Sequence, residues 1–262
     1  MTVHSIQAHC RVYRSESRAA VTKLAKMIPS GIVPRTLRSG GLVRSAAQVV
    51  THMFGDYGWL RSMREGRSVN RDGQWIPWFT YPAIDFLSQF DYTQRSVFEY
   101  GSGASTLFWA SRARCVVSVE SEADWCAKVR AGAPANCEVI FSPRDPDEYS
   151  GQIRTHGRFD VVVIDGTGES RPLCCWRALE HLEPGGMIIL DNSDLWLRSA
   201  SILREAHLIQ VDFTGFAPLD SHAHTTSVFL TRDFAFEPLQ GQQPHKSVAQ
   251  PEDAWTYEGP EG

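Results

Sequence analysis

From residue 96 onward, short apolar runs alternate with longer stretches of helical pattern, and this alternation limits the fold most strongly. The runs read SVFEY, CVVSVE, CEVIF, FDVVVID and GGMIIL. Runs that are apolar at nearly every position form strands buried on both faces, as in a parallel sheet covered by helices. The segments between them suit crossover helices, for example STLFWASRA, EADWCAKVRAG and SRPLCCWRALEHL. We therefore predict an α/β fold with helices on both faces of a mostly parallel sheet.

The last two strands are expected in LIQVDFTGF and TTSVFLTRD. The loop between them shows no helical pattern, so these two strands should pair antiparallel. Ahead of the sheet, residues 1 to about 70 read as helices broken by Pro29, Pro34 and the Gly40-Gly41 pair, and a short helix should begin near Pro82.

These patterns divide the chain into three parts. We expect residues 1–75 to form a helical extension or substrate lid and residues 76–236 to form the main domain. Residues 237–262 are rich in Gln, Pro, Glu and Gly, and we expect a poorly ordered tail there.

Composition excludes some classes of function. The formal net charge is -4, so no general basic excess points to nucleic acid, and apolar residues interrupt the arginines of the first 71 residues. No apolar run approaches the ~20 residues of a membrane span, and the N-terminus lacks an apolar signal core. Six cysteines without CxxC spacing indicate reduced thiols in a cytoplasmic protein.

The turn EYGSGAST follows the first predicted strand and precedes a helix. It lacks the lysine of a phosphate-binding P-loop, and Thr106 stands where a dinucleotide turn would have its third glycine. Glu99 precedes the turn and would repel a pyrophosphate but attract a cation. Glu120 ends the second strand, where an acid can accept hydrogen bonds from both ribose hydroxyls. The ligand should therefore carry a ribose, a positive group and no phosphate, as S-adenosylmethionine does.

From about residue 78 to 236 the chain resembles the class I S-adenosylmethionine-dependent methyltransferases, through FEYGSGAST, VVSVE, FDVVVIDG and LEPGGMIILDN in this order. The resemblance implies a Rossmann-like, seven-stranded sheet of order 3-2-1-4-5-7-6 with the seventh strand antiparallel. The segments PWFTYPAIDFL and GFAPLDSHAHTTSVF are similar to those of a largely uncharacterised bacterial subgroup.

The resemblance also implies where the cofactor binds. The methionine end should lie among Glu99, Gly101, Ser102 and Gly103, the ribose at Glu120 and the adenine near Ser142 to Asp145. We also place Tyr81 and Asp165 at the cofactor site, although lid or core packing is the alternative for Tyr81 and its aromatic neighbours. Each acid has a plainer interpretation: Glu99 could be a partner for the following helix, and Glu120 a solvated strand end. Their joint spacing and order favour ligand binding.

Asp165 ends the fourth strand, and Asp191 and Asn192 end the fifth, so the three should meet at the carboxyl edge of the sheet. Carboxylate and amide oxygens suit Mg²⁺. This set resembles the catechol- and caffeoyl-type metal-dependent O-methyltransferases, which implies an ion that lowers the pKa of an acceptor hydroxyl. The lysine base of those enzymes is replaced by Gly168, and Arg171 nearby stays charged. Metal dependence is therefore open, and Asp-Asn also favours turns.

A general base must then come from elsewhere. Candidate catalytic residues are Asp165, Asp191, His222 and His224, with Asp194 as a further base. The two histidines, two positions apart, would share one face of a strand. Surface histidines are the commoner reading of such a pair.

The predicted function is methylation of a small-molecule acceptor, most simply on an oxygen of a sugar or secondary metabolite, with or without Mg²⁺. A non-catalytic module that binds S-adenosylmethionine or its product is the alternative. A Rossmann oxidoreductase is disfavoured by the missing third glycine and by Glu99, and no NPPY- or DPPY-like motif supports methylation of nucleic-acid bases. A homodimer is compatible with the sequence, which does not fix the oligomeric state.

Overall fold

The computed structural model describes residues 41–250, with side chains from residue 46 onward. The helices predicted within residues 1–40 and the last part of the predicted tail lie outside the described residues.

The seven strands form one sheet in the order β3-β2-β1-β4-β5-β7-β6. The strands β1 to β5 pair in parallel, whereas β7 is antiparallel to both β5 and β6. Both the predicted order and the predicted antiparallel last pair are confirmed. The bounds are β1 Ser96–Tyr100, β2 Cys115–Glu120, β3 Cys137–Phe141, β4 Phe159–Ile164, β5 Leu182–Leu190, β6 Ile209–Phe216 and β7 Ala223–Leu230.

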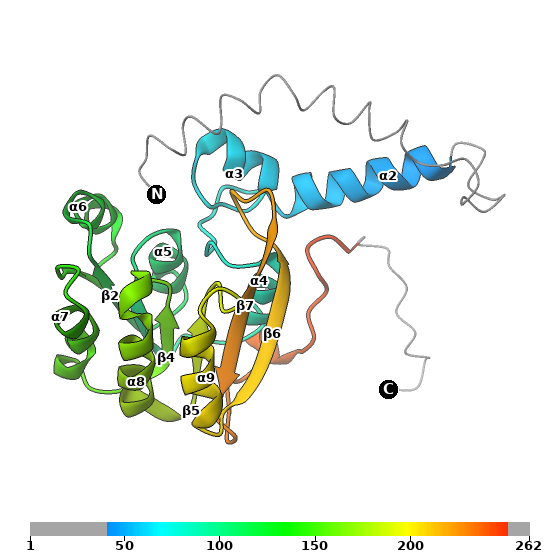
Figure 1. The fold of residues 1–262 in the computed structure, drawn as a ribbon. Helices are drawn as coiled ribbons and strands as arrows, with labels where there is room; N and C mark the ends of the chain where they lie inside the picture. Colours follow the sequence, from blue (N-terminus) through cyan, green and yellow to red (C-terminus); the bar gives the residue numbers. More distant parts are fainter. Residues whose placement is uncertain (1–40, 251–262) are drawn as a thin grey trace.

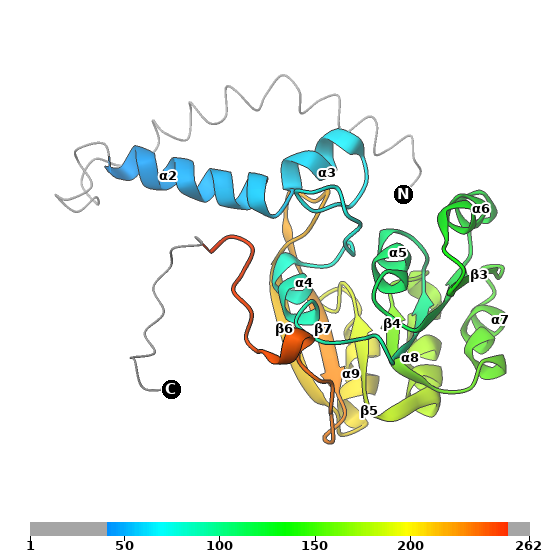
Figure 2. The ribbon, with the colours of Figure 1, turned by 180° about the vertical axis from the view of Figure 1, so that it is seen from behind.

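Helices cover both faces of the sheet (Figures 1 and 2). Apolar side chains of α4 (Tyr81–Leu87) and α5 (Ala104–Ala110) pack on one face, and those of α7 (Pro146–Gly151), α8 (Arg171–His181) and α9 (Leu197–Glu205) on the other. The helix α6 (Ala123–Gly132) packs at the β3 side. Since alternate residues of each strand face opposite sides, the continuous apolar strands serve two cores at once.

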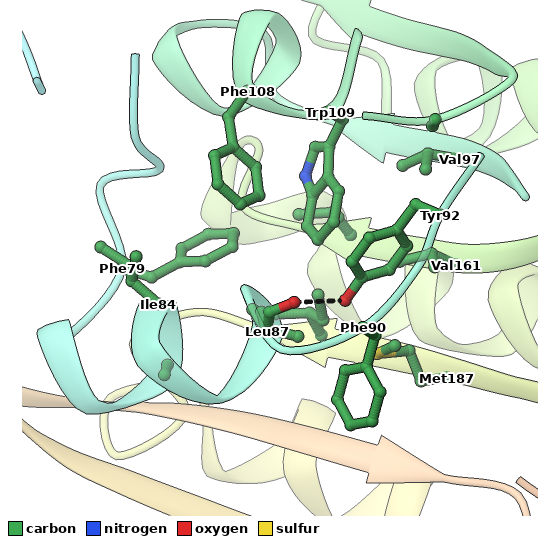
Figure 3. Packing of buried hydrophobic residues seen from close by; sticks show 14 of the residues in the cluster. Phe79, Ile84, Leu87, Phe90, Tyr92, Val97, Phe108, Trp109, Val161 and Met187 are labelled. Carbon is green, nitrogen blue, oxygen red and sulfur yellow. Dashed lines mark hydrogen bonds between the residues drawn. The ribbon is translucent and has the colours of Figure 1, made fainter. Parts of the chain in front are cut away.

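The core between the sheet and α4 and α5 is rich in aromatic side chains (Figure 3). The Tyr92 hydroxyl donates to the Leu87 carbonyl oxygen at 2.8 Å, and the Tyr92 and Trp109 rings meet edge to face with centroids 5.2 Å apart. Burying aromatic rings contributes much of the stability of a core, and edge-to-face pairs add about 0.5–1.5 kcal/mol each. This packing fixes α5, and with it the glycine turn at the start of that helix.

The part ahead of α4 is helical, as predicted for residues 41 to about 70. The helix α2 (Gly41–Thr51) projects away from the sheet, a π-helical turn (His52–Asp56) follows, and α3 (Trp59–Glu65) lies near the ends of β6 and β7 (Figure 1). A short antiparallel bridge joins Val69 and Trp75.

The chain after β7 returns to α4. Backbone hydrogen bonds join Asp91 N to Glu237 O at 2.9 Å and Leu239 N to Gln89 O at 2.7 Å. Further along, the Ser247 hydroxyl lies 2.9 Å from the Tyr57 hydroxyl oxygen. The described part of the predicted tail therefore lies against the main domain.

Two expectations from composition can be compared with the described part of the chain. Among residues 41–250, no helix is both long and apolar enough to cross a membrane. The five cysteines in this range, Cys115, Cys126, Cys137, Cys174 and Cys175, are all free thiols.

Candidate functional site

The glycine turn packs tightly against the end of β4. Gly101 has a φ of 96°, a left-handed conformation that favours glycine. A Cβ at this position would lie 2.8 Å from the backbone carbon and oxygen of Asp165 and from Gly166 N. Gly101 is therefore required by the fold itself, because the turn and the β4 end touch through their backbones.

Gly103 is different. Its φ of 170° is extended backbone that any residue can adopt. A Cβ there would meet only the Trp125 ring, at 4.0 Å. The packing of the protein does not require glycine at 103, so the absent side chain leaves room above the start of α5.

Glu99 lies beneath the turn and is completely buried. Its Oε2 accepts hydrogen bonds from the hydroxyls of Thr106, in the first turn of α5, and of Ser118, the latter at 2.9 Å. Its Oε1 has no hydrogen-bond partner among the described residues. Burial raises the pKa of Glu99 to about 7, against the opposing effect of these hydroxyls. Glu99 therefore does serve as a partner of the following helix, the plainer of the two sequence interpretations.

Glu120 ends β2 beside the turn and is 7% exposed. Its Oε2 accepts from the backbone N–H and the hydroxyl of Ser102, both at 3.1 Å. Its Oε1 accepts from the backbone N–H groups of Ser121 at 2.7 Å and Glu122 at 2.9 Å. The structure thus brings Glu120, Ser102 and the turn together, as the sequence predicts.

Two further side chains border this position. Ser142, at the end of β3, is buried, and its N–H donates to the Glu120 carbonyl oxygen at 2.9 Å. The Trp125 indole N–H donates to the Ser102 carbonyl oxygen at 2.7 Å, and 42% of this residue is exposed. Sequence reasoning missed Trp125, which it read only as part of a crossover helix. An aromatic residue five positions after the acid that ends the second strand was the available signal.

The second group of predicted residues gathers at the ends of β4 and β5. Arg171, at the start of α8, is buried and donates to Asp165 Oδ1 at 3.1 Å, to Gly166 O at 3.1 Å and to the backbone oxygen of Asp191. Burial and the nearby Asp191 raise the pKa of Asp165, and the Arg171 guanidinium opposes this shift. Arg171 therefore ties the two strand ends together and already pairs with Asp165.

Asp191 is buried between β5 and β7. Its Oδ1 accepts from the Thr226 hydroxyl at 2.5 Å and lies 3.6 Å from His224 Nε2. The other ring nitrogen of His224 lies 3.6 Å from Asp220 Oδ2. Burial lowers the pKa of His224, but Asp191 and then Asp220 outweigh it, so that the pKa is raised.

His222 does not share a strand face with His224. It is exposed in the loop before β7, whereas His224 lies on β7 and is 5% exposed. The predicted common face fails because β7 begins at Ala223, between the two histidines. Asp194, the third candidate base, accepts from the backbone N–H of Thr225 at 3.2 Å.

The predicted metal ligands do not fit Mg²⁺ in this arrangement. Asp165 Oδ1 accepts from the Arg171 guanidinium. Asp191 Oδ1 accepts from the Thr226 hydroxyl and lies beside the His224 imidazole. Asn192 has a φ of 52°, and its carbonyl oxygen accepts from the N–H groups of Leu195 and Trp196, which is turn geometry. Between residues 41 and 250 no group of three His, Cys, Asp or Glu side chains could hold an ion.

The position of the missing lysine is also filled. A Cβ at Gly168 would lie 2.1 Å from the Trp196 ring, and that ring lies 5.2 Å from the Arg171 guanidinium carbon. A side chain at 168 would therefore need Trp196 to move.

Tyr81, expected at the cofactor site, begins α4 and lies elsewhere. It is 7% exposed, its hydroxyl has no hydrogen-bond partner among the described residues, and burial raises its pKa. It borders two cavities of about 550 and 230 Å³. Neither cavity is lined by the glycine turn, Glu99 or Glu120.

No family model matches the chain. No curated protein matches it either.

Three solved structures illustrate what the chain is similar to. A proposed O-methyltransferase from Klebsiella pneumoniae is 17% identical over 66% of this chain and 86% of its own, with a TM-score of 0.46. A precorrin-6y C5,15-methyltransferase from Geobacter metallireducens is 11% identical over 57% of this chain and 87% of its own, with a TM-score of 0.44. The MycE methyltransferase of the mycinamycin pathway, solved with Mg and SAH, is 16% identical over 54% of this chain and 42% of its own, with a TM-score of 0.39.

These similarities are partial. The strand order, with its antiparallel seventh strand, is an observation on the chain itself. The glycine turn follows β1 and the acid ends β2, as the motifs require. The chain therefore has the fold of the class I S-adenosylmethionine-dependent methyltransferases.

Proposed function

We propose that the protein is an S-adenosylmethionine-dependent methyltransferase that acts on an oxygen of a small molecule, a sugar or a secondary metabolite. The observation that carries the proposal is the Glu120 carboxylate, held at the carboxyl end of β2 beside the open turn of Ser102 and Gly103. Ligands of open α/β sheets bind at this edge.

The contacts of Glu120 indicate how a ribose would bind. A carboxylate accepts about four hydrogen bonds, and Glu120 already accepts four. The two from Ser102 are longer, at 3.1 Å, than those from Ser121 and Glu122. Ribose hydroxyls would therefore replace the Ser102 hydroxyl on Oε2, while the two backbone N–H groups keep the carboxylate in place. Gly103 leaves space for the sugar, and Trp125 borders it.

When bound, the cofactor would supply an electrophilic methyl group on a sulfonium. The acceptor oxygen forms the new bond to this carbon, and the sulfur keeps the electron pair of the bond that breaks. The acceptor must also lose its hydroxyl proton, and the protein must hold the two reactants in line.

His224 is the side chain best placed to take that proton. It lies on β7 between two carboxylates, with Asp191 on one nitrogen and Asp220 on the other, each at 3.6 Å. Asp220 is itself fixed by two tryptophan N–H groups, since Trp78 donates to its Oδ2 at 3.0 Å and Trp59 to its carbonyl oxygen at 2.8 Å. The neighbouring carboxylates would stabilise the imidazolium that forms.

The proposed reaction uses no Mg²⁺. Arg171 places a permanent positive charge on Asp165, the first of the predicted ligands, and Trp196 fills the space at Gly168. The chain's own residues therefore perform the proton transfer, with no step assigned to an ion.

A non-catalytic binding module is the second candidate, and the burial of His224 favours it, because a base with 5% exposure must be uncovered to meet a substrate. Turnover separates the two. The test supplies methyl-labelled S-adenosylmethionine with a panel of sugars and hydroxylated metabolites and measures labelled product and S-adenosylhomocysteine. We expect both to form together with at least one acceptor. Cofactor binding with no methyl transfer to any acceptor would leave the non-catalytic binding module as the function.

A further inference from the structure

The larger cavity beside Tyr81 has no role in the site described above. We propose that it is the acceptor pocket and that it takes a neutral, polyhydroxylated molecule, a sugar or a glycoside. This proposal rests on the proposed function, because it identifies the bound molecule as the methyl acceptor.

The cavity has the size of a ligand pocket. Its volume of about 550 Å³ falls within the ~300–1,000 Å³ range of small-molecule sites. Five segments form its walls: residues 56–57, the bridge region of residues 70–76, the facing sides of α4 and α5, and residues 245–248. Two of the lining residues, Phe108 on α5 and Ile84 on α4, belong to the buried cluster of Figure 3. Segments near both ends of the described chain, residues 56–76 and 245–248, therefore line the same cavity.

A buried hydroxyl points to a missing partner. Tyr81 is more than nine-tenths buried and lines the cavity, and its hydroxyl oxygen has no hydrogen-bond partner in residues 41–250. Buried polar groups nearly always have a partner, and an exception needs an explanation. The oxygen is closed off from solvent, so a ligand hydroxyl in the cavity would supply the missing partner once a small movement of the wall uncovers it.

The charges of the wall indicate a neutral ligand. Arg71 lies 3.6 Å from Asp56 and 3.8 Å from Asp72, so its charge is matched within the wall. Asp85 accepts from the hydroxyls of Tyr57 at 2.9 Å and Ser247 at 3.1 Å. Counting Arg112 and Lys246, the wall carries three acidic side chains, Asp56, Asp72 and Asp85, and three basic ones, so its formal charges balance, which favours a neutral ligand.

What remains suits a sugar. A sugar ring has an apolar C–H face and an edge of hydroxyls. Tyr57, Tyr81 and Phe108 offer aromatic surface, while amide and hydroxyl side chains of Asn70, Ser88 and Gln89 offer donors and acceptors. The Arg112 guanidinium lies over Phe108, 3.8 Å from its centroid, and presents further N–H donors.

The cavity shares one wall residue with a second cavity beside the proposed base. Tyr81 is shared with the cavity of about 230 Å³, whose wall includes Asp220 and Phe216. Asp220 faces His224 at 3.6 Å. Tyr81 therefore separates the larger cavity from a space whose wall includes a neighbour of the proposed base.

The test is saturation-transfer NMR of the full chain, without cofactor, against D-glucose, D-galactose, L-rhamnose and methyl α-D-glucopyranoside, with D-glucose 6-phosphate as the charged comparison. Tyr81→Phe removes only the unpartnered hydroxyl, so it should fold as well as the wild type. Tyr92→Phe is the matched control, because its hydroxyl is bonded to Leu87 in the same core and does not line the cavity.

We expect at least one neutral sugar to bind, Tyr81→Phe to weaken it five-fold or more, and Tyr92→Phe to leave it unchanged. Binding of none of the neutral sugars, unchanged binding in Tyr81→Phe, or tighter binding of glucose 6-phosphate would overturn the proposal. Titration of the same samples with S-adenosylhomocysteine separates the two proposals. Its binding without any sugar binding rejects the pocket alone, and sugar binding without it rejects the proposed function.

Discussion

Two pairs of carboxylates lie at the carboxyl edge of one sheet, yet the protein holds them differently. Glu99 near the end of β1 and Glu120 at the end of β2 accept only from neutral N–H and hydroxyl groups. Asp165 and Asp191, after β4 and β5, meet charged or chargeable groups, Arg171 and His224. Glu120 can exchange its long contacts with Ser102 for a ligand hydroxyl, and Glu99 stays buried beneath the turn. Asp165 and Asp191 are already committed to partners within the chain.

The difference teaches that residue type at a strand end does not define its chemistry. All four acids lie at or near the ends of apolar strands and look alike in sequence. The neutral donors around Glu120 leave a negative charge for a ligand to approach, and the guanidinium on Asp165 removes the charge that would attract a metal ion. The variants below test this contrast, starting from the largest expected effect.

His224→Ala should lower kcat by about 10²-fold or more, because general bases contribute roughly 10²–10⁴-fold. Steady-state rates of methyl transfer measure the effect. The control is His207→Asn at an exposed histidine, which should keep the wild-type rate. If His224→Ala turned over at the wild-type rate, His224 would not be the general base beside Asp191.

Glu120→Ala should weaken S-adenosylhomocysteine binding by roughly 2–3 kcal/mol, the scale of hydrogen bonds to a charged group. Calorimetry measures the loss. Glu122→Ala is the matched control, since its exposed side chain pairs with Arg144 rather than with the turn. Equal affinities in the wild type and Glu120→Ala would refute the ribose assignment.

The two glycines should respond in opposite ways. Gly101→Ala should destabilise the fold by at least about 1–2 kcal/mol, because its φ of 96° strains an L-residue and its Cβ would meet the Asp165 backbone. Gly103→Ala should keep the stability and weaken only ligand binding. Denaturant unfolding and titration of both variants check this. Equal loss of stability in both would contradict the assigned roles.

The pH dependence should follow His224. The carboxylates of Asp191 and Asp220 raise its pKa above the usual 6.5, and only neutral imidazole is a base. Activity should therefore rise with pH and reach half its maximum above pH 6.5. Asp191→Asn removes one of the charges and should move that midpoint to lower pH. An unchanged midpoint in Asp191→Asn would show that Asp191 does not raise the pKa of the base.

The smallest effect is expected from metal removal. EDTA should leave both kcat and the thermal midpoint unchanged, because Arg171 already neutralises Asp165. If EDTA abolished activity and Mg²⁺ restored it, an ion would have to displace the contact between Arg171 and Asp165.

Much of the fold followed from the sequence, because apolar strands buried on two faces have few arrangements. The five parallel strands, the antiparallel last pair and the strand order were all predictable. The helices α7 and α9 were not singled out, since α7 has six residues and α9 follows an irregular turn.

The sites were less predictable. Glu120 beside the turn follows from spacing along the chain. The Arg171 contact with Asp165, and Trp196 against Gly168, depend on how a helix and a loop pack, which no local pattern encodes. The two histidines do not share a strand face because β7 begins between them. Strand boundaries are the weakest part of such predictions.

The most direct test of the account is calorimetric titration of the wild-type protein with S-adenosylhomocysteine in EDTA, with NAD as the comparison. We predict saturable binding of S-adenosylhomocysteine and none of NAD, since the turn accommodates a ribose beside Glu120 and offers no site for a pyrophosphate. Absence of S-adenosylhomocysteine binding, or binding of NAD in its place, would contradict the central claim that this edge of the sheet is a methyl-donor site.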